Sequence, residues 1–301
     1  MWILFALLSA LCFAIASMVQ KFSISKVVRD QRGIIAVHVI AAMCWISIVW
    51  IVRGRSGLGS NSDIIWALTS GVLMGAGALF YFKAFHIEDA SVVTLLNQAI
   101  VPFTLLAGFL FLSDKVGGLQ VVAAAIIIFG VSMASWSRKG FHLRTTAVIP
   151  VMLGATLLTT AVLIISKYIV DNNEVIAYTF YQTVGFAIFG ILLTLIHPAT
   201  RRGFKKNMHP FHPKMLLVIV LAEFLYVAGM LAQLKAFTYA NAGLVLSVCT
   251  SEIFLAILFG LLLTKTLPHM INEKIDRKTL GRKFVAGVLI ASGIVMLNFV
   301  N

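Results

Sequence analysis

Two carboxylates lie deep inside apolar stretches and are the strongest candidates for chemistry in this sequence. Glu223 is near the middle of the apolar run 215–237, and Glu252 is near the middle of the run 242–264. A charge at the centre of a bilayer costs about 2.5–3.5 kcal/mol on insertion scales, so such residues usually face the protein interior and mark a pathway. We therefore expect one or both carboxylates to bind a cationic substrate group or a proton. The alternative is a structural glutamate that is hydrogen-bonded between packed helices.

Neutral polar side chains accompany these carboxylates. Asn97 and Gln98 interrupt the apolar run 91–112, and Thr250 precedes Glu252 by two positions. They predict a polar stripe on a helix face that contacts the substrate, with hydrogen bonding between helices as the alternative. Pro102 removes one backbone hydrogen bond and exposes a carbonyl one turn earlier, so it is a candidate for gating or, alternatively, for a simple kink.

Three further side chains lie at a similar depth in other runs. His38 could relay protons, although a hydrogen-bonded interior histidine is the alternative. Tyr181 could stack on an aromatic or cationic ligand or pack near the membrane interface, and the adjacent Gln182 could contact the substrate.

Two lysines end apolar runs at matching positions. Lys83 and Lys235 could extend their long side chains to the membrane surface. As a matched pair on opposite faces they could instead gate the two mouths of a pathway.

Nothing in the sequence predicts catalysis or a bound cofactor. His209 and His212 in HPFHP have a chelating spacing, but no cysteine or carboxylate accompanies them, so we expect a solvated loop and no metal. No HExxH, GxSxG, Walker or GxGxxG arrangement occurs in a suitable context. The chain is therefore not expected to be an enzyme.

The elements that position these residues follow from the composition. Sixty per cent of the 301 residues are hydrophobic, 12% are charged and the mean hydropathy is +0.99, whereas soluble domains are about a quarter charged. The apolar runs are continuous, which favours an all-α integral membrane bundle over a closed barrel. We expect ten membrane-spanning helices, near 2–20, 33–52, 63–85, 91–112, 119–137, 146–169, 175–197, 215–237, 242–264 and 283–300.

Basic residues predict the orientation of these helices. Most of the 24 lysines and arginines lie in or beside the loops after the first, third, fifth, seventh and ninth runs. By the positive-inside rule those loops face the cytoplasm and both termini lie outside. We expect a multi-pass protein of the cell (inner) membrane. The net charge of +13 then reflects this bias and attraction to anionic lipid, and no soluble basic domain exists to bind nucleic acid.

An internal repeat divides the chain. KAFHIEDA at 83–90 recurs as KAFTYANA at 235–242, 152 positions later, and the same register places Ile100 over Glu252. After an 11-residue insertion in the second half, Gly130 lies over Gly293.

We therefore expect two five-helix repeats, residues 1–144 and 145–301. With five spans each, the repeats enter the membrane from opposite sides and are inverted, which is a transporter device because two such halves can rock around a midplane site.

This layout resembles the EamA-type branch of the drug/metabolite transporter superfamily. One departure is Phe254, which stands where the first half has Pro102. The residues that carry the resemblance are Lys21 and Lys167 at the ends of the first and sixth runs, Ala84-Phe85 to Ala90, Pro102, Ser113-Asp114-Lys115, and Gly130.

The resemblance implies transport of small metabolites, amino acids, nucleotide-type compounds or drugs. It also implies a cavity lined largely by the third, fourth, eighth and ninth helices. We expect a secondary transporter that moves a small organic solute by alternating access, with proton coupling through Glu223, Glu252 or His38, and a monomer or a homodimer. Two alternatives are an integral-membrane enzyme acting on a lipid, for which Glu88-Asp89 beside His86 is the nearest approach to an acid cluster, and a non-transporting subunit with an apolar interior.

Overall fold

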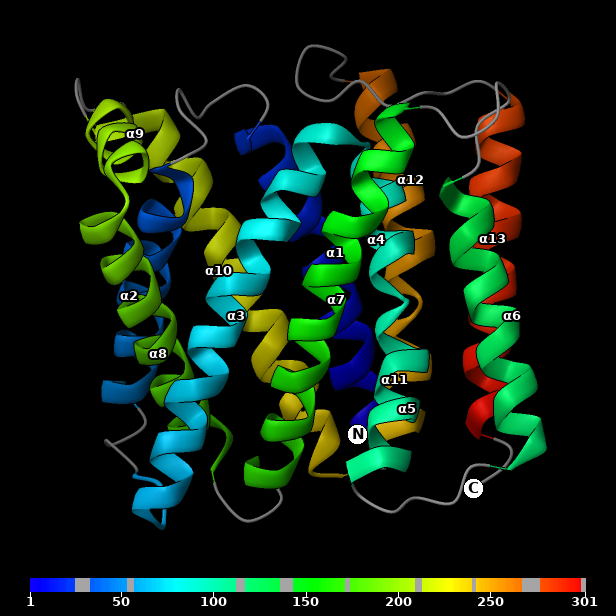
Figure 1. Cartoon of the computed structure of the whole chain (residues 1–301), viewed down its shortest axis with the longest axis horizontal. Coiled ribbons are helices and arrows are strands. Elements are labelled where there is room, and N and C mark those ends of the chain that lie inside the picture. Colours follow the sequence, from blue (N-terminus) through cyan, green and yellow to red (C-terminus); the bar gives the residue numbers. More distant parts are fainter. Residues whose placement is uncertain are drawn as a thin grey trace.

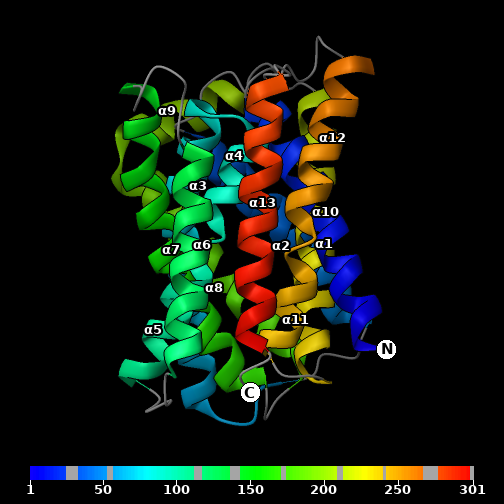
Figure 2. The same cartoon turned by 90° about the vertical axis from the view of Figure 1, so that its right-hand side faces the viewer.

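The protein is a bundle of roughly parallel helices in a computed structural model, viewed from two sides in Figures 1 and 2. The structure describes residues 1–24, 33–52, 57–111, 117–135, 143–170, 174–208, 213–239, 242–266 and 277–298. Every regular element in these ranges is helical. Continuous apolar runs favour helices in a lipid environment because each helix satisfies its own backbone hydrogen bonds.

The helices are numbered in chain order. They are α1 (Trp2–Phe22), α2 (Ile34–Val52), α3 (Asn61–Ile87), α4 (Ala90–Asn97), α5 (Ile100–Phe111), α6 (Gly118–Ser135), α7 (Leu143–Val170), α8 (Val175–Ile196), α9 (Pro198–Met208), α10 (Pro213–Phe237), α11 (Ala242–Cys249), α12 (Glu252–Thr266) and α13 (Arg277–Asn298).

Six of the ten expected spans appear in the described residues as single helices long and apolar enough to cross a membrane. They are α1, α2, α3, α7, α8 and α10. The expected run at 91–112 is divided between α4 and α5, and the run at 242–264 between α11 and α12. The sequence analysis predicted each of these two as one continuous span, so the division is a correction.

Both divisions occur at the same register of the repeat. Gln98 and Ala99 separate α4 from α5, and Thr250 and Ser251, 152 positions later, separate α11 from α12. In the first half the break lies one turn before Pro102, which cannot donate to a carbonyl. At the break in the second half Phe254 stands in place of a proline, but Thr250 Oγ1 donates to Leu246 O at 2.8 Å, and such bonds bend helices.

Helices distant in sequence pack side by side. α1 of the first half packs on α10 of the second half, and the corresponding pair, α7 of the second half and α3 of the first, also packs together. In addition, α2 lies against α8, and α6 lies against α13. A methyl group added at Gly130 would lie 2.8 Å from Ile290, and one added at Gly293 would lie 2.7 Å from Ile127. The α6–α13 contact is therefore reciprocal, with each glycine receiving an isoleucine of the other helix.

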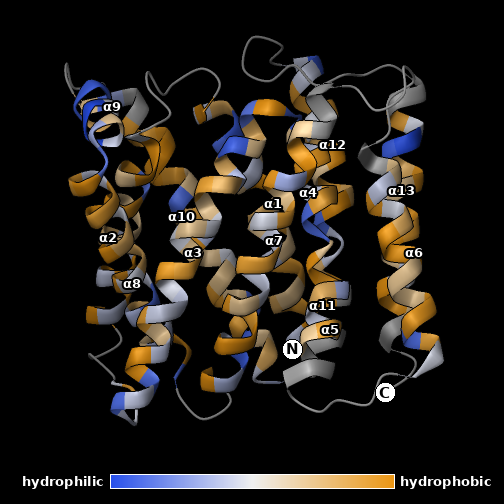
Figure 3. Ribbon diagram, viewed as in Figure 1, coloured by the Kyte–Doolittle hydropathy of each residue, from blue (hydrophilic) through white to orange (hydrophobic). Residues whose placement is uncertain are grey.

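Hydrophobic residues predominate along most of the helices (Figure 3), and many of the large ones are exposed. Ile196 is 76% exposed and Leu4 is 72% exposed. Such a surface is costly in water and suits a bilayer, where lipid tails are as apolar as leucine.

The two repeated turns lie at opposite ends of the bundle (Figure 1). The upper turn, Glu88 and Asp89 between α3 and α4, lies at the top of the view. The lower turn, which begins with Thr238 and Tyr239 after α10, lies at the bottom. The start of α1 and the end of α13 also lie at the lower end.

One segment that the sequence analysis assigned to a loop is helical. α9 begins at Pro198, a residue that suits the first turn of a helix because its missing N–H needs no partner there. Phe204 packs beside Val37 and Ile219, whereas Arg201 and Lys205 are exposed. Burial of one face against α2 and α10 accounts for the helix. His209 and His212, the residues considered for metal, lie outside the described residues.

Candidate functional site

A central cavity of about 230 Å³ lies between helices of both halves. Five of the side chains that the sequence analysis singled out line it: Asn97, Gln98, Gln182, Glu223 and Glu252. They come from α4, α8, α10 and α12 and from the break after α4. The apolar remainder of the lining includes Phe13 and Met74. The bundle therefore gathers polar groups that are far apart in sequence around one space.

Glu223 is buried and paired. Its carboxylate is hydrogen-bonded to His38 Nδ1, which projects from α2, and the His38 ring lies 4.6 Å from the ring of Phe82. His38 is fully buried, and its Nε2 has no hydrogen-bond partner among the described residues. A hydrogen bond between an imidazole and a carboxylate can hold its proton on either partner. The pair can therefore pass a proton from one side chain to the other without a change in packing.

Glu252 differs from Glu223 in its surroundings. It opens α12 directly after the helix break, and no hydrogen bond or ion pair joins its carboxylate to another of the described residues. The first turn of a helix carries free N–H groups and the positive end of the helix dipole, which favours an anionic side chain there. Glu252 thus lines the cavity with a carboxyl group that is available to a ligand.

The amides occupy two sides of the cavity. Gln98 lies at the break between α4 and α5, beside Asn97, the last residue of α4. Gln182 projects from α8 and is buried, and its Oε1 has no hydrogen-bond partner among the described residues. Gly71 allows α3 to approach α8 here, because a side chain at this position would lie 1.9 Å from Gln182 O.

Six predicted site residues do not line the cavity. Thr250 bonds back to its own helix at the break. Tyr181 makes an edge contact with Phe180 at 5.5 Å. Pro102 lies one turn beyond the break in α5, and both Lys83 and Lys235 are exposed at helix ends. His38 is not in the lining either, but it reaches the site through Glu223.

Several lining residues were not singled out from the sequence. Each is a single polar or aromatic residue inside an apolar helix, which was the available signal: Ser17, Gln20, Tyr81, Tyr226 and Gln233. Gln20 and Gln233 lie on α1 and α10, the pair of helices that pack together across the halves. Within the described ranges no group of histidine, cysteine and acidic side chains is suited to a metal.

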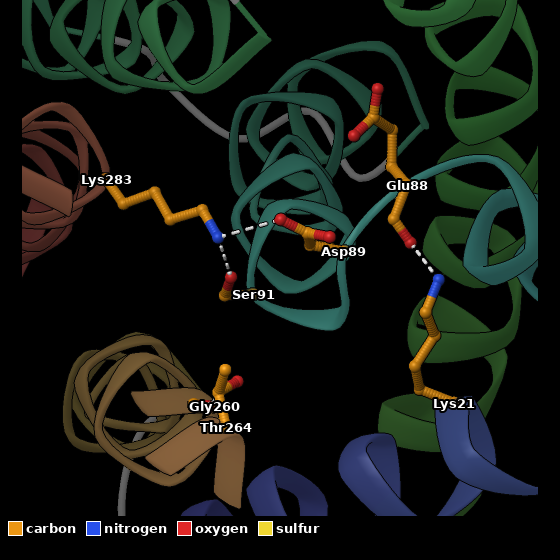
Figure 4. Close-up of polar contacts among 7 residues, drawn as sticks. All are labelled: Lys21, Glu88, Asp89, Ser91, Gly260, Thr264 and Lys283. Atoms are coloured by element: carbon orange, nitrogen blue, oxygen red, sulfur yellow. Dashed lines mark hydrogen bonds and ion pairs between the residues drawn. The ribbon is translucent and has the colours of Figure 1, made fainter. Parts of the chain in front are cut away.

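Above the cavity, two lysines hold the upper turn (Figure 4). Lys283 of α13 is buried and donates to Asp89 Oδ2 at 3.2 Å and to Ser91 Oγ at 2.6 Å. Lys21, at the end of α1, donates to the backbone carbonyls of Phe85 and Glu88. The upper turn is thus tied to the first helix and to the last.

The first half of the chain matches a family of known proteins. Residues 1–136 match the model of the EamA-like transporter family, which confirms the resemblance stated from the sequence. A protein of Sinorhizobium sp described as "Uncharacterized transporter in cobO 3'region" is 29% identical over 133 residues, which are 43% of this chain and 92% of that protein.

The fold also has a counterpart among solved structures. One described as "Crystal structure of protein" aligns with a TM-score of 0.58 at 14% identity and covers 97% of each chain. At this identity the likeness concerns the fold alone. Together with the apolar helices, the family match supports a multi-pass integral membrane protein.

Proposed function

We propose, from the premise that this chain is an EamA-like membrane transporter, that it is a secondary transporter which moves a small organic solute through the central cavity by alternating access. The observation that carries this proposal is the cavity itself, where carboxylates and amides from both halves meet at membrane depth. Polar residues there are costly unless they serve a pathway.

The proposed arrangement is ten spans in two inverted five-helix repeats, residues 1–144 and 145–301. Three features support it: the helix breaks share one register, α1–α10 and α3–α7 are corresponding pairs, and Gly130 and Gly293 make reciprocal contacts. In transporters built this way the broken helices meet at the substrate site, and rocking of one half against the other exposes that site to each side in turn.

The two divided spans also place an acidic and an amide side chain at the site. Glu252 begins a half-helix, and Gln98 lies at the matching break. Free backbone groups at such breaks can bind solute or ions where irregular backbone lines a cavity. We assign substrate contact to Glu252, Asn97, Gln98 and Gln182, which line the cavity. Thr250 and Tyr181 are assigned a supporting role near it.

Proton coupling is assigned to the Glu223–His38 pair. The pair faces the cavity at Glu223 and is enclosed at His38, so a proton that enters from the cavity has one buried partner. Glu223 is hydrogen-bonded to His38 on α2, and it lines the cavity together with Tyr226 on α10 and Glu252 on α12. We expect Glu223→Gln to remove the dependence of solute uptake on a pH gradient in proteoliposomes, whereas Glu174→Gln, an exposed carboxylate before α8, leaves it unchanged.

Alternating access can be tested before the solute is known. Cys12, Cys44 and Cys249 are first replaced, and one cysteine is then placed at Ala78, which lines the cavity on α3. We expect a membrane-impermeant maleimide to label Ala78→Cys from either face of oriented vesicles. The matched control is Ala67→Cys, also on α3 but fully buried outside the cavity lining, which should resist labelling from both faces.

The same experiment separates the competing functions. Labelling of Ala78→Cys from neither face would favour a non-transporting subunit, and labelling from one face only would contradict alternating access. The enzyme alternative depended on Glu88 and Asp89, but Asp89 is paired with Lys283 in the described structure. The family match likewise favours a transporter.

The orientation is proposed from the distribution of basic residues. The upper end, which carries the basic helix α9, is assigned to the cytoplasm, and the termini to the outside. Labelling of Asn301→Cys from the outside of intact cells would support this orientation, and labelling only from the cytoplasmic side would overturn it.

A further inference from the structure

Two hydrogen-bond acceptors in the cavity lining have no donor among the described residues. The Glu252 carboxyl group is bonded to none of them, and Gln182 Oε1 is buried and has no partner among them. A buried acceptor left without a donor costs about 1–3 kcal/mol, more when it is charged. A ligand that donates hydrogen bonds would remove this cost.

The described residues that line the cavity favour a cationic ligand over an anionic one. They include two carboxyl groups, Glu223 and Glu252, and no lysine, arginine or histidine. In the described structure the partner of Glu223 is His38, which is not in the lining. Glu252 has no such partner there and is available to pair with a cationic ligand, whereas an anionic ligand would find no opposite charge.

Two tyrosines line the cavity together with Glu252. Tyr81 comes from α3 and Tyr226 from α10. The face of a tyrosine ring attracts a cation, and it does so most strongly where water is excluded. A cavity lined by a carboxyl group and two tyrosines is a suitable site for an ammonium group on an apolar body.

We infer that the solute is a small organic cation with a protonated amine, whose ammonium group is bound by Glu252 and donates to Gln182 Oε1. This inference rests on the proposed transport function and adds the chemical class of the substrate. It also divides the work of the two glutamates: Glu252 binds the cation, and Glu223 with His38 carries the proton. We expect carboxylates and phosphates to be poorer substrates, because the described residues that line the cavity include no lysine, arginine or histidine.

A set of three probes of similar shape and different charge tests the inference. They are phenethylammonium (a cation), 2-phenylethanol (neutral) and 3-phenylpropionate (an anion). Binding is measured by the rise in unfolding temperature of the purified protein, and transport by uptake into proteoliposomes. We expect the cation to bind and enter and the other two to do neither.

The role of Glu252 is tested on the same cation. Loss of one charge-assisted hydrogen bond weakens binding by about 10- to 150-fold, so we expect Glu252→Gln to lower the affinity by this factor. Glu174→Gln, which changes an exposed carboxylate outside the cavity, is the matched control and should leave the affinity unchanged.

Each outcome decides the inference separately from the transport function. Preference for the neutral or anionic probe, absence of binding of the cation, or equal binding by Glu252→Gln and Glu174→Gln would overturn the substrate class. The transport proposal would still stand if Ala78→Cys is labelled from both faces. Failure of that labelling would overturn alternating access whichever probe binds.

Discussion

The two ends of the bundle begin from nearly the same eight-residue segment and are held in different ways. At the upper turn, Lys283 pairs with Asp89, and Lys21 donates to backbone carbonyls of the turn. At the lower turn, Tyr239 stacks against Phe5 at 6.2 Å, and Lys235 lies 5.0 Å from the centre of the Tyr239 ring. The upper turn is therefore held by charged side chains, and the lower turn by contacts of aromatic rings.

The residues at corresponding positions explain this difference. Lys167 corresponds to Lys21 but is exposed and has no hydrogen bond to a described residue. Gln120 corresponds to Lys283, and its side chain accepts instead from Gly117 N at 2.8 Å. Asn241, which corresponds to Asp89, lies outside the described residues. The two corresponding turns thus carry different side chains. This difference suits a transport cycle in which the upper end is closed by an ion pair, Lys283 with Asp89, that can separate.

The largest expected effect comes from breaking the ion pair at the upper turn. Asp89→Ala removes the Asp89 carboxylate from the buried Lys283, and loss of one partner of a buried pair costs about 3–5 kcal/mol. We expect a lower unfolding temperature and faster labelling of Ala78→Cys from the α9 side. The double variant Asp89→Asn with Lys283→Met removes both charges and should recover part of the stability. An unchanged rate of Ala78→Cys labelling in Asp89→Ala would show that this ion pair does not close the upper end.

The two corresponding lysines give a more direct comparison. Lys21→Gln removes charge-assisted hydrogen bonds to two carbonyls and should destabilise the protein by about 1.5–3 kcal/mol. Lys167→Gln changes an exposed side chain and should stay within about 0.5 kcal/mol. Thermal unfolding of both variants in one detergent measures the difference, and equal effects would contradict the asymmetry of the two ends.

A contact that is alike in both halves provides the symmetrical reference. Gly130→Ala and Gly293→Ala each place a methyl group against an isoleucine of the facing helix, at 2.8 and 2.7 Å. Overpacking of this kind costs about 1–3 kcal/mol. We expect the two variants to lose similar amounts of stability in the same unfolding assay, and a tolerated change at one glycine only would argue against reciprocal packing of α6 and α13.

The smallest effect is expected at the lower turn. Lys235→Gln removes a cation from above the Tyr239 ring, a contact worth about 0.5–1 kcal/mol at exposed sites. Stability should fall by no more than this, and labelling of Ala78→Cys should not change. Lys83→Gln, at the corresponding position of the upper end, serves as the control. A large increase in labelling for either lysine would support the gating role predicted from the sequence.

Sequence reasoning located much of the helical framework because apolar runs and helices coincide. The run predicted at 2–20 is α1 at Trp2–Phe22, and the run at 63–85 is α3 at Asn61–Ile87. It missed the break before Glu252, since no proline marks that position and Thr250 acts through a hydrogen bond. It also missed α9, whose apolar face is short and is stabilised by contacts with α2 and α10.

The candidate site could be predicted only in part. Five cavity residues were visible in the sequence because a polar group inside an apolar run is rare and costly. Their partners were not visible. His38 and Glu223 are 185 positions apart, and Lys283 lies far along the chain from the turn that it holds, so no local pattern connects them.

The sequence by itself determined that this is a helical membrane protein with a repeated unit, because hydropathy and register are properties of the chain alone. Only the tertiary structure decided which of the two cavity glutamates is paired with a histidine, and at which end of the bundle lysines bind the repeated turn. These contacts depend on which helices pack against each other. The residues of one helix do not by themselves determine which other helix its side chains will contact.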